Sequence, residues 1–388
     1  MDRHSILVAM ALVAPIGAVA QVADHDTVAA ERGLIEEVAG IKKKTDKFNL
    51  YLNMRGDFNA AWRGSTFDEG GFRMKQLRIE MTGQINDWLS YRYRQRLNKG
   101  DSESGYRDNV LGSIDYAGIG IRLGKVSFFL GKQCAAYGGI DFNRNPIEVL
   151  ENPALVEYMG NFMTGVKVAY DFTPSQQLQF QVLNSLTGSS ESMYGDYEKS
   201  KMPMVYTLNW NGNFNNFYKT RWSASFMNET KGKNLVYFAL GNEFRFSDKV
   251  SAYADWMYSR QDVDRMGVMT KMVAGADASF NTTKVDYMSA LVHVDYRFHP
   301  SWNVFCKIIC DTSGIYSSHD GLEKGNYCTS WGYLAGLEYY PFKDRTLHFF
   351  AAYTGRNYLY TDRAKTFGNK DYFTNSLSVG FIWQMPIF

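Results

Sequence analysis

From Phe48 to the C-terminus, apolar residues recur at every second position in one short segment after another. A period of two places the apolar residues on one face of a β-strand and the polar residues on the other. Leu178, Phe180 and Val182, for example, alternate with three glutamines. About sixteen such segments follow one another, and an even number of antiparallel strands leaves both chain ends on the same side.

The connections between these segments alternate between short and long. Long polar loops are expected at about 63–71, 99–109, 134–159, 187–202, 229–233, 261–283, 312–327 and 357–372, with short turns between them. This rhythm is typical of bacterial outer-membrane barrels, and closure leaves no strand edge unpaired in lipid. A soluble β-sandwich or β-helix explains the alternation but not the rhythm. The sequence therefore predicts an all-β, transmembrane antiparallel β-barrel of about 16 strands over residues 48–388.

The N-terminus has the features of an export signal. Arg3 precedes an apolar run that extends to about Ile16, and the small residues Ala18 and Ala20 fit a cleavage site before Gln21. The alternative, a membrane anchor, would need about 20 apolar residues, more than this run contains. We expect a signal peptide over residues 1–20 and localisation to the outer membrane of a Gram-negative bacterium.

Residues 21–47 follow a different period from the barrel. Val28, Leu34, Ile35, Val38 and Ile41 recur at helical spacing, with acidic residues before basic ones. We expect a short N-terminal helix or linker on the periplasmic side. The pattern is compatible with a short coiled-coil piece that supports assembly and equally with a simple linker helix.

The remaining composition argues against several other classes. The four cysteines match no metal-ligand spacing, and the net charge of +2 gives no reason to expect a nucleic-acid partner. Neither a cofactor nor a metal is expected. The expected contacts are with outer-membrane lipid and with small hydrophilic solutes or inorganic anions.

A ladder of arginines marks the segment 89–100. Arg92, Arg94 and Arg96 lie two residues apart, so on a strand they share one face, opposite Tyr91 and Tyr93. Because an Arg or Lys that faces lipid costs about 2–4 kcal/mol near the midplane, we expect the arginines to face the lumen. A barrel of this size is too wide for side chains to fill, so the lumen is predicted to be wet and polar.

The same argument places other charged residues in the lumen. They are Arg55, Asp57, Arg78, Glu80, Lys167, Arg221, Glu243, Arg245, Asp255, Asp295, Arg297, Lys307, Asp311 and Glu338. Of these, Arg55, Arg78, Glu80 and Arg221 join the ladder as the candidate pore-lining residues for anions. The ladder is either an electropositive strip that attracts anions or the partly salt-bridged wall of an unselective pore.

The third long loop is the longest and contains apolar residues as well as Asp141, Arg144, Glu148 and Glu151. A loop of this length and composition can fold into the barrel. We expect it to constrict the pore there, because a barrel this wide without a constriction would leak. The alternative is an extracellular cap.

Residues 72–98, which include the ladder, and residues 121–133 resemble the phosphate-selective porin O/P family, in the branch found in Bacteroides-like bacteria. The resemblance implies a sixteen-stranded porin, usually trimeric, whose third loop lies inside the barrel and whose selective members pass phosphate-like anions along an arginine ladder with lysines. Arg92, Arg94 and Arg96, with Arg78, match the ladder. The lysine cluster has no counterpart, so general or weakly selective uptake is expected.

Two other functions fit a barrel of this kind. An outer-membrane barrel enzyme needs a positioned nucleophile and base, but neither His293 nor His348, the two histidines that could face the lumen, lies in a recognisable Ser/His/acid pattern. We therefore expect no catalytic residues. An adhesin or structural barrel without an open pore would rely on the long loops, and their sequences do not exclude it.

Overall fold

The computed structural model describes residues 31–41, 43–99, 110–185, 194, 197–275, 278 and 281–388. The expected signal peptide, its cleavage site, most of loop 99–109 and part of loop 187–202 lie outside the described residues. Helices are short: α1 (Leu34–Ala39), the 3-10 turn η1 (Asp141–Asn143), α2 (Ala154–Tyr158), α4 (Val268–Ala274) and α5 (Asp362–Lys365). None of the described helices is long and apolar enough to cross a membrane.

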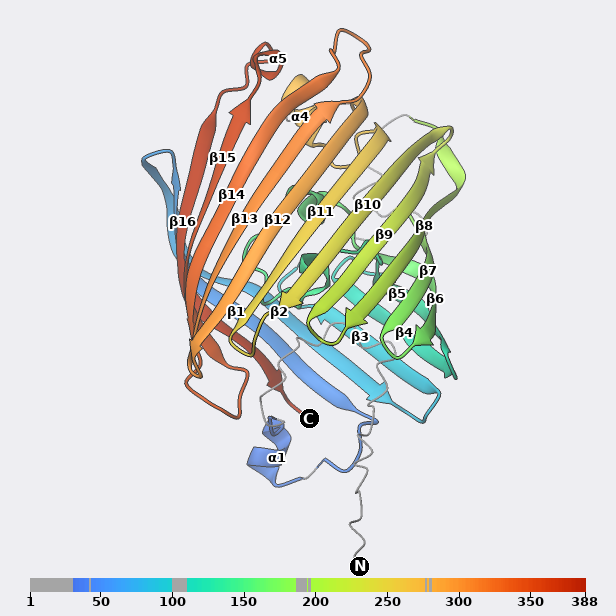
Figure 1. The fold of residues 1–388 in the computed structure, drawn as a ribbon, viewed down its shortest axis with the longest axis vertical. Coiled ribbons are helices and arrows are strands. Elements are labelled where there is room, and N and C mark those ends of the chain that lie inside the picture. Colours follow the sequence, from blue (N-terminus) through green and yellow to red (C-terminus); the bar gives the residue numbers. More distant parts are fainter. Residues whose placement is uncertain are drawn as a thin grey trace, which may run out of the picture.

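Sixteen antiparallel strands form one closed barrel, as the period-two pattern predicts (Figure 1). They are β1 (Asn49–Arg63), β2 (Thr66–Gln84), β3 (Leu89–Arg96), β4 (Ile114–Leu123), β5 (Val126–Cys134), β6 (Phe162–Thr173), β7 (Gln176–Asn184), β8 (Lys199–Phe214), β9 (Tyr218–Thr230), β10 (Lys233–Arg245), β11 (Val250–Val263), β12 (Thr283–His299), β13 (Trp302–Ile315), β14 (Gly325–Tyr339), β15 (His348–Tyr360) and β16 (Tyr372–Pro386). Each strand pairs with its chain neighbours, and β1 closes the ring by pairing with β16.

Two of the expected long loops are tight turns instead. β1 and β2 meet at Gly64 and Ser65, and β9 and β10 meet at Lys231 and Gly232. The polar residues of the segments 63–71 and 229–233 mostly belong to strands. Residues 66–70 are exposed to water at the end of β2, whereas Glu229 and Thr230 of β9 are buried and Glu229 pairs with Arg265. Of the other expected loops, those at 134–159, 261–283, 312–327 and 357–372 coincide, in their described residues, with connections at the end opposite the chain termini. Those at 99–109 and 187–202 lie largely outside the described residues.

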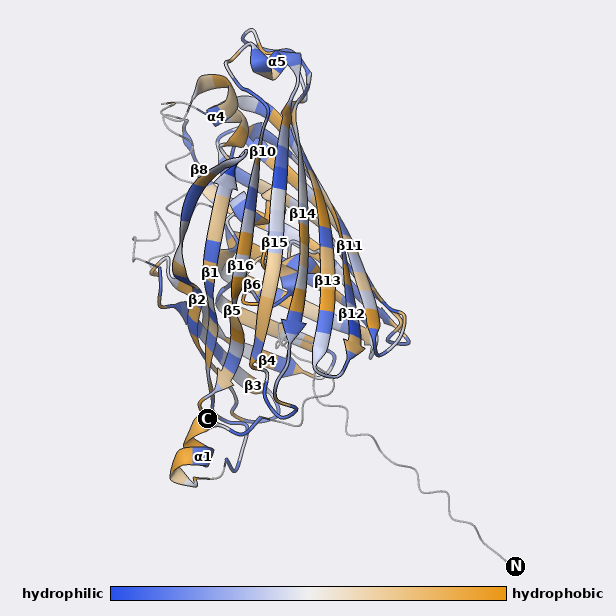
Figure 2. Ribbon diagram, turned by 90° about the vertical axis from the view of Figure 1, so that its left-hand side faces the viewer, coloured by the Kyte–Doolittle hydropathy of each residue, from blue (hydrophilic) through white to orange (hydrophobic). Residues whose placement is uncertain are grey.

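The outer surface of the barrel carries the apolar row of each strand. Phe180, Leu208, Val292 and Ile308 are all roughly half exposed, whereas their sequence neighbours point inward. Apolar and polar residues alternate along the ribbons (Figure 2). This pattern suits a barrel whose outer surface faces lipid, because an apolar residue there needs no polar partner.

Helix α1 lies beneath the barrel, close to the C-terminus (Figure 1). The backbone N–H of Ile35 donates to the carbonyl of Ile387 at 3.0 Å, and Glu37 pairs with Arg345 at 2.6 Å. The short N-terminal helix is therefore confirmed, although it spans only six residues. Val38 and Ile41 point away from the barrel and are exposed.

The lumen is not polar throughout, contrary to the sequence expectation. Residues of the inner face, among them Met227, Tyr237 and Met257, form a buried apolar cluster with residues of α2 and α4. β10 accordingly has apolar residues on both faces at its loop end, Leu235 to Leu240. An inner wall can be apolar where a loop covers it and excludes water.

The loop that carries α4 is held by a buried carboxylate outside the strands. Asp264 accepts hydrogen bonds from the N–H groups of Gly267 and Thr270 and from the hydroxyl of Tyr287 at 2.6–2.9 Å. Burial raises the pKa of Asp264, although these donors act in the opposite direction. The hydrogen bonds fix α4 against the inner wall of β12.

Candidate functional site

The arginine ladder of β3 faces the lumen as expected, but its guanidinium groups are not free. The side chains of Arg92 and Arg94 are almost fully buried, and that of Arg96 is one-quarter exposed. Tyr91 and Tyr93, which are partly exposed, lie on the other face. The alternation within β3 therefore separates the charges from the lipid side.

One carboxylate that the sequence did not single out collects three arginines. Asp115 on β4 lies 3.1 Å from Arg78, from Arg94 and from Arg96, and its side chain is completely buried. The register between β3 and β4 shifts here, because Arg94 lies opposite Tyr116 while the next residue, Gln95, lies opposite Ile114. A β-bulge places two residues of one strand opposite one of its partner. Asp115 and Tyr116 both end up inside the barrel.

The fourth arginine has a carboxylate of its own. Arg92 pairs with Glu80 on β2 at 2.7 Å, and its guanidinium lies 3.8 Å from the centre of the Tyr116 ring. Arg78 and Arg96 are directly opposite each other across β2 and β3, an arrangement that would repel without Asp115. Among the described residues, four guanidinium groups thus share two carboxylates. The described part of this wall is therefore salt-bridged and contains more positive than negative groups.

The third long loop, residues 135–161, folds into the barrel and crosses it, behind β10–β12 in Figure 1. Its backbone contacts β7, where Ala136 donates to Gln181 at 2.7 Å, and β12, where Leu155 donates to Ser289 at 3.3 Å. It also reaches β1, where Arg55 donates to the carbonyls of Ile147 and Val149 at 3.0 and 2.6 Å. The loop is therefore bound to strands on several sides of the lumen.

A buried ion pair anchors the middle of this loop. Asp141, at the start of η1, lies 2.7 Å from the Lys307 ammonium group on β13, and both side chains are almost fully buried. The hydroxyl of Tyr253 donates to the same carboxylate oxygen at 2.6 Å. Asp255 on β11 accepts from the backbone N–H groups of Ile140 and Asp141 at 2.8 Å each.

The end of the loop has a second anchor on β13 and β15. Arg356 pairs with Glu151 of the loop and with Asp311 of β13, both at 3.0 Å. Asp311 in turn accepts from the backbone N–H of Ala154 at 3.0 Å. The two remaining predicted loop residues contact the same side of the barrel: Arg144 lies 3.8 Å from Asp295 on β12, and Glu148 lies 3.8 Å from His348 on β15.

Close backbone packing also holds the loop against β10. A Cβ atom at Gly241 would lie 2.7 Å from the Cα atom of Gly139 and from the backbone nitrogen of Ile140. Gly139 itself has a φ of +82°, which favours glycine. Two glycines on different elements therefore allow the loop to approach the wall at this point.

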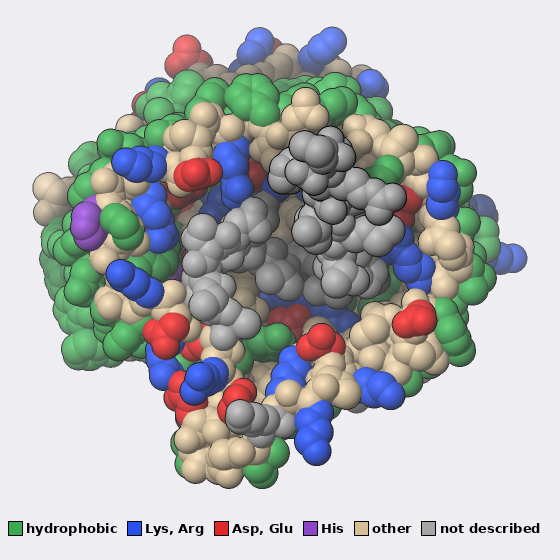
Figure 3. Space-filling view, turned by 60° about the horizontal axis from the view of Figure 1, so that its bottom comes forward, with side chains coloured by type: hydrophobic (Ala, Val, Ile, Leu, Met, Phe, Trp, Pro, Cys, Tyr) green, Lys and Arg blue, Asp and Glu red, His purple; other side chains and the backbone are tan. Residues whose placement is uncertain are grey.

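Below the loop, toward the end with the short turns, lies a cavity of about 1850 Å³. Its described lining includes eleven Lys or Arg residues and six Asp or Glu residues. Of the predicted site residues, Arg144, Glu148 and Arg221 line this cavity, whereas the ladder arginines do not. Lys and Arg side chains surround the mouth at this end, with Asp and Glu side chains among them (Figure 3).

Two cations near the cavity have no carboxylate partner among the described residues. Arg221 on β9 lines the cavity, and its Nε atom is buried without a hydrogen-bond partner. Lys167 on β6 is close enough to Arg221 and Arg92 for their charges to interact, and it contacts the ring of Phe129 at 5.9 Å. Cations without a counter-ion are the ones available to a passing anion.

A closed β-barrel with one row of apolar residues outward, a charged lumen and an inward-folded loop defines an outer-membrane channel protein. The sequence match agrees with this class. Residues 48–385 match the family described as phosphate-selective porin O and P, and the chain belongs to this family. It is an outer-membrane porin for passive diffusion of small solutes, and family and fold indicate a channel rather than an enzyme.

Solved structures share the fold at low sequence identity. The outer-membrane channel DcaP of Acinetobacter baumannii is 14% identical with a TM-score of 0.60, covering 87% of this chain and 96% of that chain. An anion-selective porin from Comamonas acidovorans is 8% identical with a TM-score of 0.55, covering 87% and 98%. OmpT of Vibrio cholerae in its trimer form is 11% identical with a TM-score of 0.55, covering 87% and 99%. A search of curated proteins finds no significant match.

Proposed function

We propose that this porin prefers anions, including phosphate-like anions, over cations. The observation that carries the proposal is the excess of Lys and Arg in the cavity lining, together with Lys167 and Arg221, for which the described residues offer no carboxylate partner. Positive charges along a pore raise the local concentration of anions and lower that of cations. The family description and the Comamonas porin support the same preference.

The inward-folded loop and the ladder have different parts in this proposal. The loop carrying Asp141, Arg144, Glu148 and Glu151 narrows the lumen, so that a passing ion comes close to charged side chains. The buried ladder arginines act through their net charge at a distance and not by direct contact. A wide, water-filled pore would screen such charges within about 10 Å at 0.1 M salt.

We expect changing Lys167 and Arg221 together to glutamine to reduce the preference for anions. One unit charge about 5 Å from an ion in water attracts an anion by about 0.8 kcal/mol and repels a cation by the same amount, so each loss should lower the anion-to-cation permeability ratio by up to about 16-fold. The reversal potential of channels in planar bilayers under a salt gradient measures this ratio. The exposed Lys231→Gln, paired with Glu198 at the far end of β9, is the control. An unchanged ratio in the double variant contradicts the proposal.

We also propose that the porin is a homotrimer. The trimer form of Vibrio cholerae OmpT supports this assembly, as do two exposed apolar residues, Val38 of α1 and Ile41 just after the helix. Light scattering of the detergent-solubilised protein after size exclusion is expected to give three times the chain mass. A mass of one chain contradicts the proposal.

We also propose that the chain consists of a signal peptide, a periplasmic linker and the barrel. Residues 1–20 are the signal peptide, residues 21–47 form the periplasmic linker with α1, and residues 48–388 form the barrel. The position of α1 at the end with the short turns supports the periplasmic placement, because short turns face the periplasm in such barrels.

A further inference from the structure

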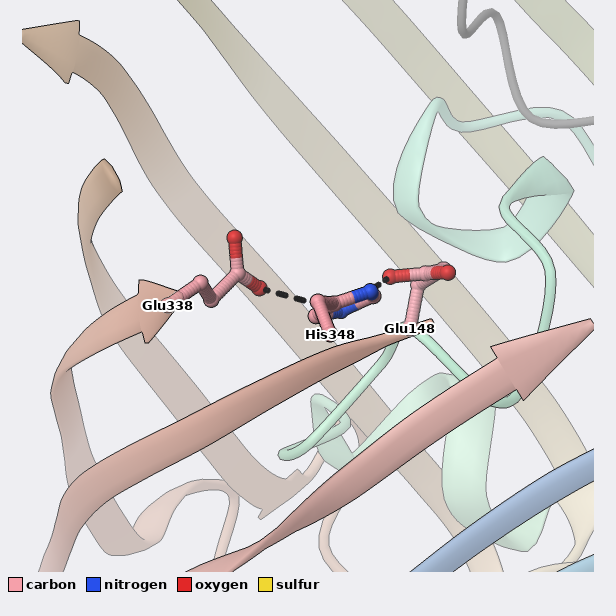
Figure 4. A group of neighbouring side chains, drawn as sticks. All are labelled: Glu148, Glu338 and His348. Carbon is pink, nitrogen blue, oxygen red and sulfur yellow. Dashed lines mark ion pairs between the residues drawn. The ribbon is translucent and has the colours of Figure 1, made fainter. Parts of the chain in front are cut away.

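A histidine and two carboxylates meet where the inward-folded loop contacts the wall of the barrel. His348 on β15 lies between Glu148 of the loop and Glu338 on β14 (Figure 4). Its Nε2 atom is 3.8 Å from Glu148 Oε2 and 3.8 Å from Glu338 Oε1. The three ligand atoms all lie within 4.8 Å of one another.

The hydrogen bonds of His348 determine which of its two ring nitrogens carries a proton. The other nitrogen then presents its lone pair to the carboxylates. The Nδ1 atom is 2.8 Å from the carbonyl oxygen of Thr346, so Nδ1 must carry the proton. In the neutral ring Nε2 is then an acceptor, and it faces two groups that are also acceptors. His348 is 1% exposed, and its Nε2 atom has no hydrogen-bond partner. A positive charge between the two carboxylates can come from a proton on Nε2 or from a bound cation.

The neighbours of the cluster orient its ligand atoms. Asn303 and Tyr340 donate to Glu338 Oε2 at 2.8 and 2.9 Å, which leaves Oε1 directed at His348. The Tyr340 ring stacks on the imidazole with 4.5 Å between the ring centres. Hydrogen bonds of this kind to the outer atoms of ligands are usual in metal sites.

We propose that Glu148, Glu338 and His348 bind a divalent transition-metal cation, with zinc as the best match. One imidazole nitrogen and two carboxylate oxygens are ligands that zinc accepts, whereas calcium and magnesium favour oxygen alone. Ligands about 2.1 Å from a tetrahedral zinc lie about 3.4 Å apart, so small movements of the side chains complete the site. Water would supply the fourth ligand.

The cation has a route to the site and a structural consequence there. Glu148 and Glu338 line the cavity, so an ion from the periplasmic side reaches them without unfolding the loop. Because Glu148 belongs to the loop and the other ligands to β14 and β15, the bound cation ties the loop to the wall. The site does not depend on the proposed anion preference.

Titration of the full-length, detergent-solubilised protein with zinc chloride, after removal of metal by a chelator, tests the site. We expect one zinc per chain by calorimetry. Glu148→Gln, Glu338→Gln and His348→Gln should each weaken binding at least about 10–100-fold, which is the effect of losing even an outer hydrogen bond to a ligand. If the buried His348 variant fails to fold, the two glutamate variants decide.

Two matched controls make the result specific. His293 is also a buried, lumen-facing histidine beside a carboxylate, Asp295 at 2.9 Å, and His293→Gln should keep zinc affinity. Glu243→Gln removes a different cavity carboxylate and should also keep it. Zinc should slow backbone hydrogen exchange around Glu148 in the wild type but not in Glu148→Gln. Absence of stoichiometric binding, or binding that survives all three ligand variants, overturns the proposal.

Discussion

Replacing Asp115 by asparagine is expected to lower the free energy of unfolding by about 3–5 kcal/mol, the cost of breaking a buried ion pair from one side. Asp115 is completely buried and lies 3.1 Å from Arg78, Arg94 and Arg96. Its removal takes away the carboxylate that three guanidinium groups share, and two of those groups face each other across β2 and β3. Urea unfolding of the refolded barrel, followed by tryptophan fluorescence, measures the change.

Asp171→Asn is the matched control for Asp115. Asp171 pairs with a single arginine, Arg122, at the same distance of 3.1 Å, but the two side chains are 22% and 31% exposed. Because water solvates both charges, we expect a loss of less than about 1 kcal/mol. Equal losses in the two variants would mean that Asp115 does not hold the ladder together.

Replacing Lys307 by methionine is expected to detach the inward-folded loop. The Asp141 carboxylate would remain buried, and the oxygen that now accepts from both Lys307 and Tyr253 would keep only the hydrogen bond from the Tyr253 hydroxyl. The loop would also lose the 2.8 Å hydrogen bond from the Lys307 ammonium group to the carbonyl of Glu151. We again expect a loss of about 3–5 kcal/mol, here in the free energy that holds the loop in its inward position. Single-channel conductance should rise, and hydrogen exchange over residues 135–161 should accelerate.

The double variant Asp141→Asn with Lys307→Met separates the ion pair from other effects. Removing both partners leaves no unpaired buried charge, so the double variant should be more stable than Lys307→Met alone. Lys249→Met, at an exposed turn of the same cavity, should change neither conductance nor exchange in the loop. A double variant as unstable as Lys307→Met would show that the salt bridge does not anchor the loop.

The strands and their orientation could be predicted because a barrel in lipid enforces one local rule. An outward residue must be apolar and an inward one can be polar, so period two reveals both the strand and its faces. The rule fails where the environment changes. Above the membrane, residues 66–71 remain in β2 although they are polar, and beneath the covering loops Leu235 to Leu240 are apolar on both faces.

The candidate site was predictable residue by residue but not as a set of contacts. Arg92, Arg94 and Arg96 face inward as alternation requires, yet Asp115 joins them only because a bulge interrupts the alternation at that residue. A bulge depends on how two strands pair and has no period of its own. The same holds for Glu148, which meets Glu338 and His348 of the neighbouring strands β14 and β15 only through the path of the loop.

The sequence by itself determined that this chain forms a closed barrel with charged residues inside, because lipid contact constrains every second residue of each strand. Only the tertiary structure decided which of those charges neutralise one another and which remain available. That outcome depends on strand register and on where the third loop lies in the lumen. The arginines of the ladder are held by Glu80 and Asp115, whereas Lys167 and Arg221 have no carboxylate partner among the described residues.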